Sequence, residues 1–302
     1  MRRNALRWPG YLAVAAAATL LTSACEITVD AGPYSVQEEK RFAVSGTPDL
    51  SLATFDGSVE IRSWDKSEVL IEIEKRAADK TMAEAIKITV EQSGNTISLT
   101  VKKPDGLQPA FGFKVSPTAR IVASVPRRCN IVARSGDGSI SIERVEGAIE
   151  LHTGDGSVKG RDVAGTLRVT TGDGSLRFEN VSGSLDLESG DGGARVSGRL
   201  QALTLKTGDG SVEVRAEDGS SMAADWEIRT GDGGLRLELP ANFDAALDAS
   251  TGDGGVRVRG FGEPAKAGSD EDSPSDMKRP LGAGGKRLRL RSDSGTITVR
   301  TI

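Results

Sequence analysis

One tetrapeptide, Thr/Ser-Gly-Asp-Gly, recurs seven times in this chain, and its spacing constrains the fold more than any other feature. The first five copies follow one another at intervals of 18 residues, and the last two intervals are longer. A fixed period of this kind is typical of a chain wound into stacked, nearly identical units. The repeat aspartates are Asp137, Asp155, Asp173, Asp191, Asp209, Asp232 and Asp253.

Each unit contains two short runs in which apolar and polar residues alternate, and glycine turns separate these runs. The unit 153–170, TGDGSVKGRDVAGTLRVT, shows the plan, and 171–188 repeats it. Such alternation predicts short strands with one buried face. Strands this short, repeated so often, are expected to pair with the same strand of the next unit. The sequence therefore predicts an all-β, single-chain parallel β-helix (β-solenoid) with about 18 residues per coil, for which a right-handed winding is favoured.

The interior of this solenoid can be predicted by aligning the units. In one inward column a single glycine, Gly160, lies one coil from a single aromatic residue, Phe178. Because protein interiors are close-packed, we expect the phenylalanine ring to occupy the space that the glycine leaves. Two such inward columns are Ile140, Val158, Leu176, Ala194, Val212 and Ile142, Gly160, Phe178, Val196, Val214.

Departures from the repeat predict the domain organisation. Residues 25–40 are expected to be a tether, 41–118 irregular coils and 119–260 regular coils of one elongated domain. A brief helix is expected within 77–86 and a Pro- and Gly-rich loop over 102–118. Residues 261–285 are rich in Pro, Gly, Ser and acidic residues, which predicts a disordered insertion. Residues 286–302 are then expected to form the last, closing coil, with 292–295 in place of the repeat turn.

The N-terminus has the features of an export signal. Three arginines precede an apolar stretch, residues 11–21, that is too short to span a bilayer as a stable helix. This pattern predicts a secretory signal peptide over residues 1–24. The segment ends in Leu-Thr-Ser-Ala before Cys25, which resembles the lipobox of bacterial lipoproteins and makes Cys25 the expected lipidation site. The chain would then be held in the bacterial cell envelope, at the periplasmic face of the outer membrane or at the cell surface. The alternative is ordinary cleavage and release of a soluble secreted protein.

Cysteine usage and charge restrict the chemistry further. The chain has two cysteines, so a lipidated Cys25 would leave Cys129 without a disulfide partner, as a small packed residue. Neither cysteine belongs to a metal or redox motif. The formal net charge is −4, and signal cleavage would remove three arginines and no acid. An acidic chain with 4% aromatic residues is not expected to bind nucleic acid.

The row of repeat aspartates has two interpretations. The favoured one is structural: aspartate accepts hydrogen bonds from turn amides, and the flanking glycines allow positive φ. The alternative is weak cation binding. Calcium prefers six or more oxygen ligands, which a single carboxylate row supplies poorly, so no metal site is predicted. The weak candidates for such binding are Asp137, Asp155, Asp173, Asp191 and Asp209.

Neither a catalytic site nor a cofactor is expected. The coils lack the long loops that would enclose a cleft, and the only histidine, His152, occupies an outward position. The threonines that begin the repeats alternate inward, which predicts a buried hydroxyl ladder instead of an ice-binding face. One outward column carries consecutive cations, which form the candidate binding ladder: Lys159, Arg177 and Arg195.

The repeat unit Ser/Thr-Gly-Asp-Gly-Ser-Val, followed by Gly-x-Leu-x-Val, resembles a bacterial putative-adhesin family of unknown function. Val125-Pro126 and the closing segments 288–290 and 295–299 resemble the edges of that family, so the resemblance covers about residues 41–302. It implies a non-catalytic envelope β-solenoid and brings no catalytic residues. Two functions remain open: an envelope adhesin or binding scaffold for a glycan or protein, and a periplasm-facing structural or stress-regulatory lipoprotein that assembles end to end through the last coil.

Overall fold

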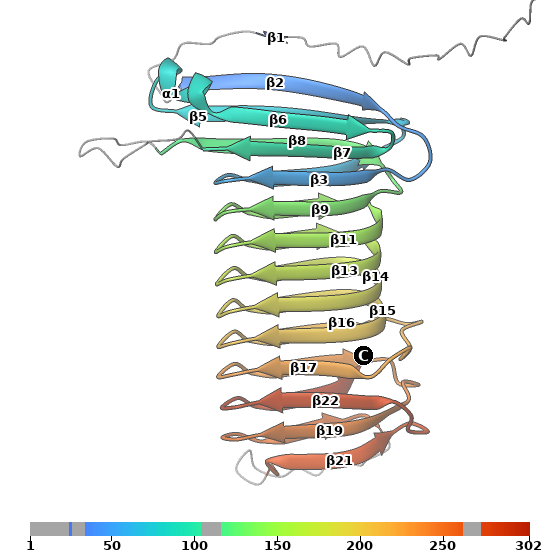
Figure 1. Cartoon of the computed structure of the whole chain (residues 1–302). Coiled ribbons are helices and arrows are strands. Elements are labelled where there is room, and N and C mark those ends of the chain that lie inside the picture. The colour runs from blue at the N-terminus through green and yellow to red at the C-terminus, as the bar shows by residue number, and fades with distance from the viewer. Residues whose placement is uncertain (1–23, 26–33, 104–115, 262–272) are drawn as a thin grey trace, which may run out of the picture.

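The computed structural model describes residues 24–25, 34–103, 116–261 and 273–302. Residues 1–23 of the expected signal peptide, most of the expected 102–118 loop and residues 262–272 of the expected insertion lie outside these ranges. Within them the protein is an all-β, solenoid-like stack of strands (Figure 1). Its one described helix is α1 (Lys80–Ala85), which begins at Asp79, whose side chain accepts a hydrogen bond from the amide of Met82. This helix confirms the brief helix expected within 77–86.

The middle of the stack consists of two parallel ladders, each made of one strand from every coil. In the regular part, paired strands are 18 residues apart, as in the pairing of Val158 with Leu176 and of Leu167 with Leu185. The predicted pairing between equivalent strands of successive units is therefore confirmed here. The strands of this region are β9 (Asn130–Ser135), β10 (Ile140–Glu143), β11 (Glu146–Thr153), β12 (Val158–Arg161), β13 (Ala164–Thr171), β14 (Leu176–Ser189), β15 (Ala194–Thr207), β16 (Val212–Ala216), β17 (Trp226–Thr230) and β18 (Leu235–Leu239).

The two ladders enclose a continuous hydrophobic core. The inward column from Ile140 to Val212 is in register and fully buried, as the alternation predicts. Gly160 pairs with Phe178, and a Cβ atom added to Gly160 would lie 2.4 Å from Cδ1 of that ring. The expected compensation between the missing and the large side chain is thus confirmed.

At the N-terminal end, antiparallel strands cover the stack. β2 pairs along its length with β5, and β5 pairs with β8, both antiparallel. Since β2 begins at Tyr34, the ordered fold starts earlier than the expected tether boundary at residue 40. β2 can pair with β5 although its sequence matches no repeat unit, because the backbone hydrogen bonds of an antiparallel pair do not require a repeated sequence. The strands of this end are β1 (Ala24–Cys25), β2 (Tyr34–Ala43), β3 (Asp49–Thr54), β4 (Val59–Trp64), β5 (Glu68–Ala77), β6 (Lys87–Ser93), β7 (Thr96–Lys102) and β8 (Thr118–Pro126).

At the C-terminal end, the coils are not stacked in chain order. β22 lies between β17 and β19, and β23 lies between β18 and β20. The segment expected to be the last coil is therefore enclosed between two earlier-translated coils (Figure 1). β21 follows as an antiparallel partner of β19, so part of the expected disordered insertion is a strand. These strands are β19 (Ala245–Thr251), β20 (Val256–Arg259), β21 (Asp276–Leu281), β22 (Arg287–Ser292) and β23 (Ile297–Thr301).

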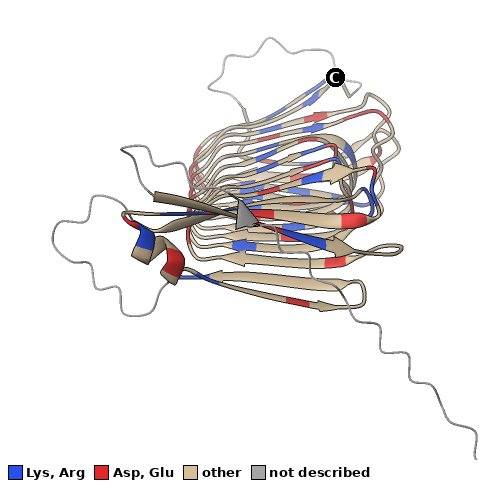
Figure 2. Ribbon diagram, turned by 90° about the horizontal axis from the view of Figure 1, so that it is seen from above, with Lys and Arg blue, Asp and Glu red and all other residues tan. Residues whose placement is uncertain are grey.

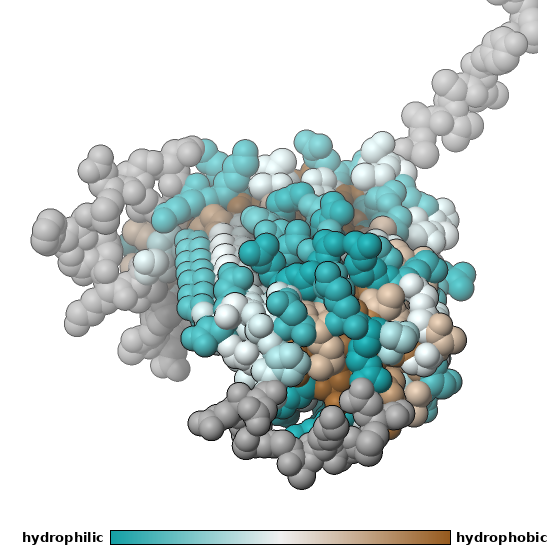
Figure 3. Space-filling model, turned by 90° about the horizontal axis from the view of Figure 1, so that it is seen from below, coloured by the Kyte–Doolittle hydropathy of each residue, from teal (hydrophilic) through white to brown (hydrophobic). Residues whose placement is uncertain are grey.

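The repeat tetrapeptide forms one corner of every coil. The hydroxyl of Thr171 donates to the carbonyl oxygens of Gly154 and Gly156 in the preceding coil, at 3.0 and 2.9 Å. Thr153, Thr207 and Thr230 make equivalent bonds, so the predicted buried hydroxyl ladder is confirmed. The straight columns of equal hydropathy along the stack in Figure 3 reflect this repetition.

The corner glycines are required for a different reason than expected. Among the seven repeats, only Gly254 has φ in the left-handed region. The others are needed because the corners touch through their backbones: a Cβ atom on Gly174 would lie 2.1 Å from the carbonyl oxygen of Gly156. Close backbone approach, rather than positive φ, thus fixes glycine at the corner.

Candidate binding surface

The three cations of the candidate ladder occupy one row on the outside of the stack. Lys159 pairs with Arg177, and Arg177 pairs with Arg195, on β12, β14 and β15. All three are exposed, because each alternates with inward residues of the core column. The structure therefore brings together the residues that the sequence selected, and Figure 2 shows positive residues on successive strands of the stack.

The same row continues toward the C-terminal end with mixed residues. Glu213 follows Arg195, and Arg236 follows Glu213. Thr298 of β23 then lies between Arg236 and Arg257, because the C-terminal coil is enclosed at this level. We call this row, from Lys159 to Arg257, the basic row. Sequence alignment of the repeats finds its arginines, whereas only the tertiary pairing places Thr298 within it.

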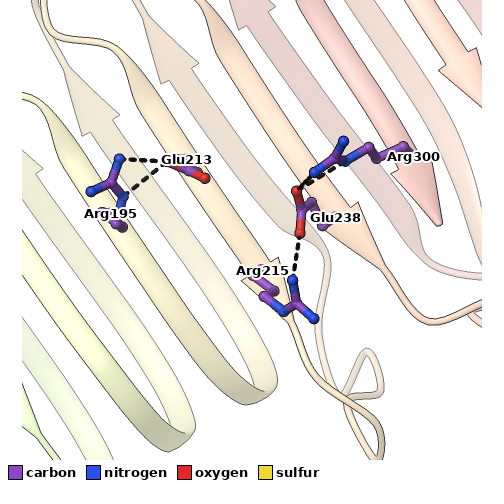
Figure 4. A network of polar contacts seen from close by, with 5 residues as sticks. All are labelled: Arg195, Glu213, Arg215, Glu238 and Arg300. Atoms are coloured by element: carbon purple, nitrogen blue, oxygen red, sulfur yellow. Dashed lines mark hydrogen bonds and ion pairs between the residues drawn. The ribbon is translucent and has the colours of Figure 1, made fainter. Parts of the chain in front are cut away.

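Ion pairs neutralise the basic row incompletely. The guanidinium of Arg195 lies 2.7 Å from a carboxylate oxygen of Glu213 (Figure 4), and that of Arg177 lies 3.5 Å from Glu179. Within the described ranges, the side chains of Lys159 and Arg236 form neither a hydrogen bond nor an ion pair. The row thus keeps an excess of positive charge at its surface.

A row of small residues runs beside the basic row and forms the floor of a shallow groove. Each floor residue directly precedes a strand and lies two positions before the residue of the basic row, and the groove is lined by the cations together with Ser175, Gly193, Ser211 and Gly234. Sequence analysis did not select these floor residues. The available signal was that a serine or glycine directly follows each Gly-Asp-Gly. We call this feature the basic groove.

The outward row on the other side of the basic row is largely paired. Glu238 is buried, and its carboxylate accepts hydrogen bonds from Arg215 at 3.1 Å and from Nε of Arg300 at 2.9 Å (Figure 4). Arg161 lies 3.6 Å from Glu179. Charges in this row therefore satisfy one another, in contrast to those of the basic row.

The repeat aspartates are exposed at the corner and do not line the basic groove. Among the described residues, no hydrogen bond reaches the carboxylates of the five weak cation candidates, and no cluster of three potential metal ligands is found. The expected amide bonds to aspartate are replaced by others: amides of corner glycines donate to glycine carbonyls of the preceding coil, and the Gly138 amide donates to the Ser135 hydroxyl.

The remaining candidate residues lie apart from the groove. His152 is an exposed residue of β11. Cys129 is fully buried, and burial, with a smaller effect of the Asp49 charge, raises the pKa of its thiol to about 12. Cys25 belongs to β1, whose two residues pair with Gln37 and Glu38 of β2. No helix in the described part of the chain is long and apolar enough to cross a membrane.

Three carboxylates outside the basic groove, Glu38, Glu74 and Asp248, have lowered pKa values, and two of them, Glu38 and Asp248, show the cause. Burial raises the pKa of Glu38, but the hydrogen bond and charge of Lys75, 2.7 Å away, outweigh burial and lower it overall. Burial also raises the pKa of Asp248, and the hydrogen bond and charge of Arg291 lower it overall. Both carboxylates are therefore held ionised by a cationic partner, which is typical of structural ion pairs.

The fold and its surfaces define an all-β, solenoid-like protein with a long outer face. Residues 48–300 match the family model Toastrack DUF4097, and the chain belongs to this family. A search of curated proteins returned no match.

Several solved structures match this chain at low identity. A putative cell adhesion protein from Clostridium sporogenes is 14% identical, with a TM-score of 0.32, over 90% of this chain and 100% of that one. A putative adhesin from Parabacteroides merdae is 12% identical, with a TM-score of 0.42, over 88% and 96%. A putative lipid binding protein from Parabacteroides distasonis is 13% identical, with a TM-score of 0.40, over 88% and 96%.

Proposed function

We propose that this protein is a non-catalytic binding scaffold of the bacterial cell envelope, an adhesin in the broad sense, that is exported and anchored by lipid on Cys25. The observation that carries the proposal is the basic groove, where Lys159, Arg177 and Arg195 form an exposed row on a rigid stack. A right-handed winding with about 18 residues per coil is part of this proposal. The parallel ladder of this stack places the three cations about 4.8 Å apart, which is the ordinary spacing of neighbouring strands.

Export and anchoring are supported by the N-terminal sequence. The arginine-rich start, the short apolar stretch and the small residues before Cys25 fit a lipoprotein signal. We expect cells grown with labelled palmitate to incorporate label into the wild-type protein and not into Cys25→Ser. Equal labelling of both proteins, or of neither, would contradict the anchor.

The binding function is tested separately, with purified protein and isolated cell envelopes. Protein that carries Cys25→Ser, and therefore no lipid, serves as wild type here and as the background of the variants, and it is expected to sediment with envelopes and to be released by salt, because exposed charge interactions are screened. The variant Lys159→Ser/Arg177→Ser/Arg195→Ser should bind less. Its matched control, Arg127→Ser/Arg199→Ser/Lys206→Ser, removes the same number of exposed cations outside the groove. If both triple variants bind like wild type, the basic groove is not the binding surface.

End-to-end assembly through the last coil receives no support from the strand order. The segment 296–302, which would have offered a free edge, lies between β18 and β20. The antiparallel strand β21 covers the C-terminal end of the ladder that contains β17, β22 and β19, and the antiparallel strands β2 and β5 cover the stack at its N-terminal end. We therefore place the function on the side of the stack instead of at its ends.

A further inference from the structure

We infer that the basic groove binds a linear acidic polysaccharide that runs along the stack, with acidic groups of successive sugars meeting cations of successive coils. This inference rests on the proposed binding function and names its ligand class. It follows from three properties of the groove, which are the spacing of its cations, the size of its floor residues and the chemistry of its lining.

The cations are arranged along a line. Lys159, Arg177 and Arg195 lie on three adjacent strands, so their backbone positions span roughly 10 Å in steps of about 4.8 Å. A ligand that used this row fully would carry negative charge repeatedly along one direction. A compact anion would meet one or two of these cations, whereas a chain polymer with an acid on each sugar meets all of them.

The floor allows a flat ligand to approach the backbone. Gly193 and Gly234 have no side chain, and Ser175, Ser211 and Thr296 add short hydroxyl groups. Hydroxyls of this kind both donate and accept hydrogen bonds, as the hydroxyls of sugars do. The floor therefore offers hydrogen-bonding partners to sugar rings while the basic row holds their acidic groups.

The lining favours a polysaccharide over a nucleic acid. Single-stranded nucleic acids are bound through aromatic side chains on which the bases stack. Among the described residues that line the groove there is no aromatic side chain.

Glu213 restrains binding in the middle of the row. It is the one acidic residue in the described lining of the groove, and it holds Arg195 in an ion pair of 2.7 Å. Replacing its carboxylate by an amide removes a negative charge that faces the ligand and releases the Arg195 guanidinium. The inference therefore requires that Glu213→Gln bind an acidic polysaccharide more tightly than wild type.

The experiment measures binding of polygalacturonate oligomers to the full mature chain by calorimetry at low salt. We expect Lys159→Ser/Arg177→Ser/Arg195→Ser to bind about tenfold more weakly, since each exposed pair contributes a small free energy. Glu213→Gln should bind several-fold more tightly, and Arg127→Ser/Arg199→Ser/Lys206→Ser should bind like wild type. All substitutions replace exposed or half-exposed side chains, and thermal unfolding verifies that each variant is folded.

Three results would overturn the inference: equal weakening in both triple variants, no gain in Glu213→Gln, or binding of oligothymidylate as tight as that of polygalacturonate. A neutral dextran oligomer serves as the uncharged probe and is expected not to bind. If the triple variant folds poorly, Lys159→Ser alone and Glu213→Gln still test the prediction in opposite directions. Envelope binding that depends on the basic row without polygalacturonate binding would refute this ligand class and leave the proposed function intact.

Discussion

At the scale of single residues, the fold depends on the corner glycines, because no side chain larger than a hydrogen atom fits at these positions. The corner backbones are in contact from coil to coil, as at Gly156, Gly174 and Gly192. The Thr or Ser that begins each repeat donates hydrogen bonds to carbonyl groups of the preceding coil. Hydroxyl and glycine thus perform complementary roles: one removes unsatisfied acceptors from the interior, and the other permits the coils to approach. The exposed aspartate between the glycines makes neither contribution in this structure.

Gly174→Ala tests the contact between corners. The added Cβ would lie 2.1 Å from the Gly156 oxygen and 2.5 Å from its carbon, and backbone atoms cannot move aside as a flexible side chain can. We expect a loss of about 1–3 kcal/mol or more in the free energy of unfolding, measured by urea denaturation. The control is Gly234→Ala, whose Cβ would make an ordinary contact at 3.7 Å. Equal stability of the two variants would refute this account.

Cys129 predicts a specific pH dependence. Its folded-state pKa of about 12 exceeds the ordinary value of 9.0, because burial disfavours the thiolate. Between these values the unfolded chain loses the proton and the folded chain keeps it, so the contribution to stability is complete below pH 9 and declines as the pH rises. In a Cys25→Ser background, Cys129→Ala should therefore lose stability less steeply from pH 9 to 11, by on the order of 1–2 kcal/mol. Parallel curves for the two proteins would contradict the prediction.

At the scale of elements, the order of strands in space differs from their order in the chain. Between β18 and β19 the chain passes over one level, and β22 and β23 later occupy that level. At the N-terminal end β3 lies between β7 and β9 in the same manner, and β4 between β8 and β10. The coil of β3 and β4 and the coil of β22 and β23 are thereby enclosed on both sides, so every edge of these two coils is paired.

Cross-linking tests this order directly. Arg236 is in register with Thr298, whereas Arg257 lies one strand beyond it. In a Cys25→Ser/Cys129→Ala background, Arg236→Cys/Thr298→Cys should form a disulfide, because neighbouring strands are about 4.8 Å apart. Arg236→Cys/Arg257→Cys should not, because two strand spacings exceed the reach of a disulfide, about 7 Å between Cα atoms. Peptide mapping without reduction identifies the bond, and efficient cross-linking of the second pair would establish stacking in chain order instead.

At the scale of the whole molecule, the stack must end without exposing an edge that recruits another chain. β21 closes the ladder that contains β17, β22 and β19, and it carries charged residues and Pro280, which has no backbone amide to donate. Charges and proline are the features by which edge strands avoid pairing further. Val258, Phe261 and Met277 are partly buried hydrophobic residues that pack against the core, and Figure 3 views this end of the stack.

Replacing residues 276–281 by a Gly/Ser segment tests the role of β21. The replacement uncovers the edge of β19, and we expect self-association that increases with protein concentration, measured by sedimentation velocity. Wild type should remain monomeric. The control Asp276→Glu/Lys278→Arg changes two exposed side chains and keeps both the charges and the backbone pairing, so it should behave like wild type. A monomeric replacement variant would show that β21 does not protect the end.

Much of the fold and part of the candidate surface could be predicted from the repeat alone. The spacing of 18 residues determines which side chains of successive coils align. The inward columns through Val158 and Phe178 can therefore be predicted, and so can the row of cations Lys159, Arg177 and Arg195. The small floor residues and Glu213 were present in the same alignment but were not selected. They acquire a role only because the groove places them beside the cations.

What the sequence by itself determined is periodic: two short strands in each repeated unit, their inward and outward faces, and the row of basic side chains. These features depend only on the pairing of neighbouring units, and this pairing can be predicted because the units share one sequence pattern. Only the tertiary structure decided the ends, where β23 separates β18 from β20 and β21 covers β19. Coils with the same periodic pattern can occupy adjacent levels interchangeably, so the pattern cannot specify their order. That choice depends on the packing of segments that lie outside the repeat.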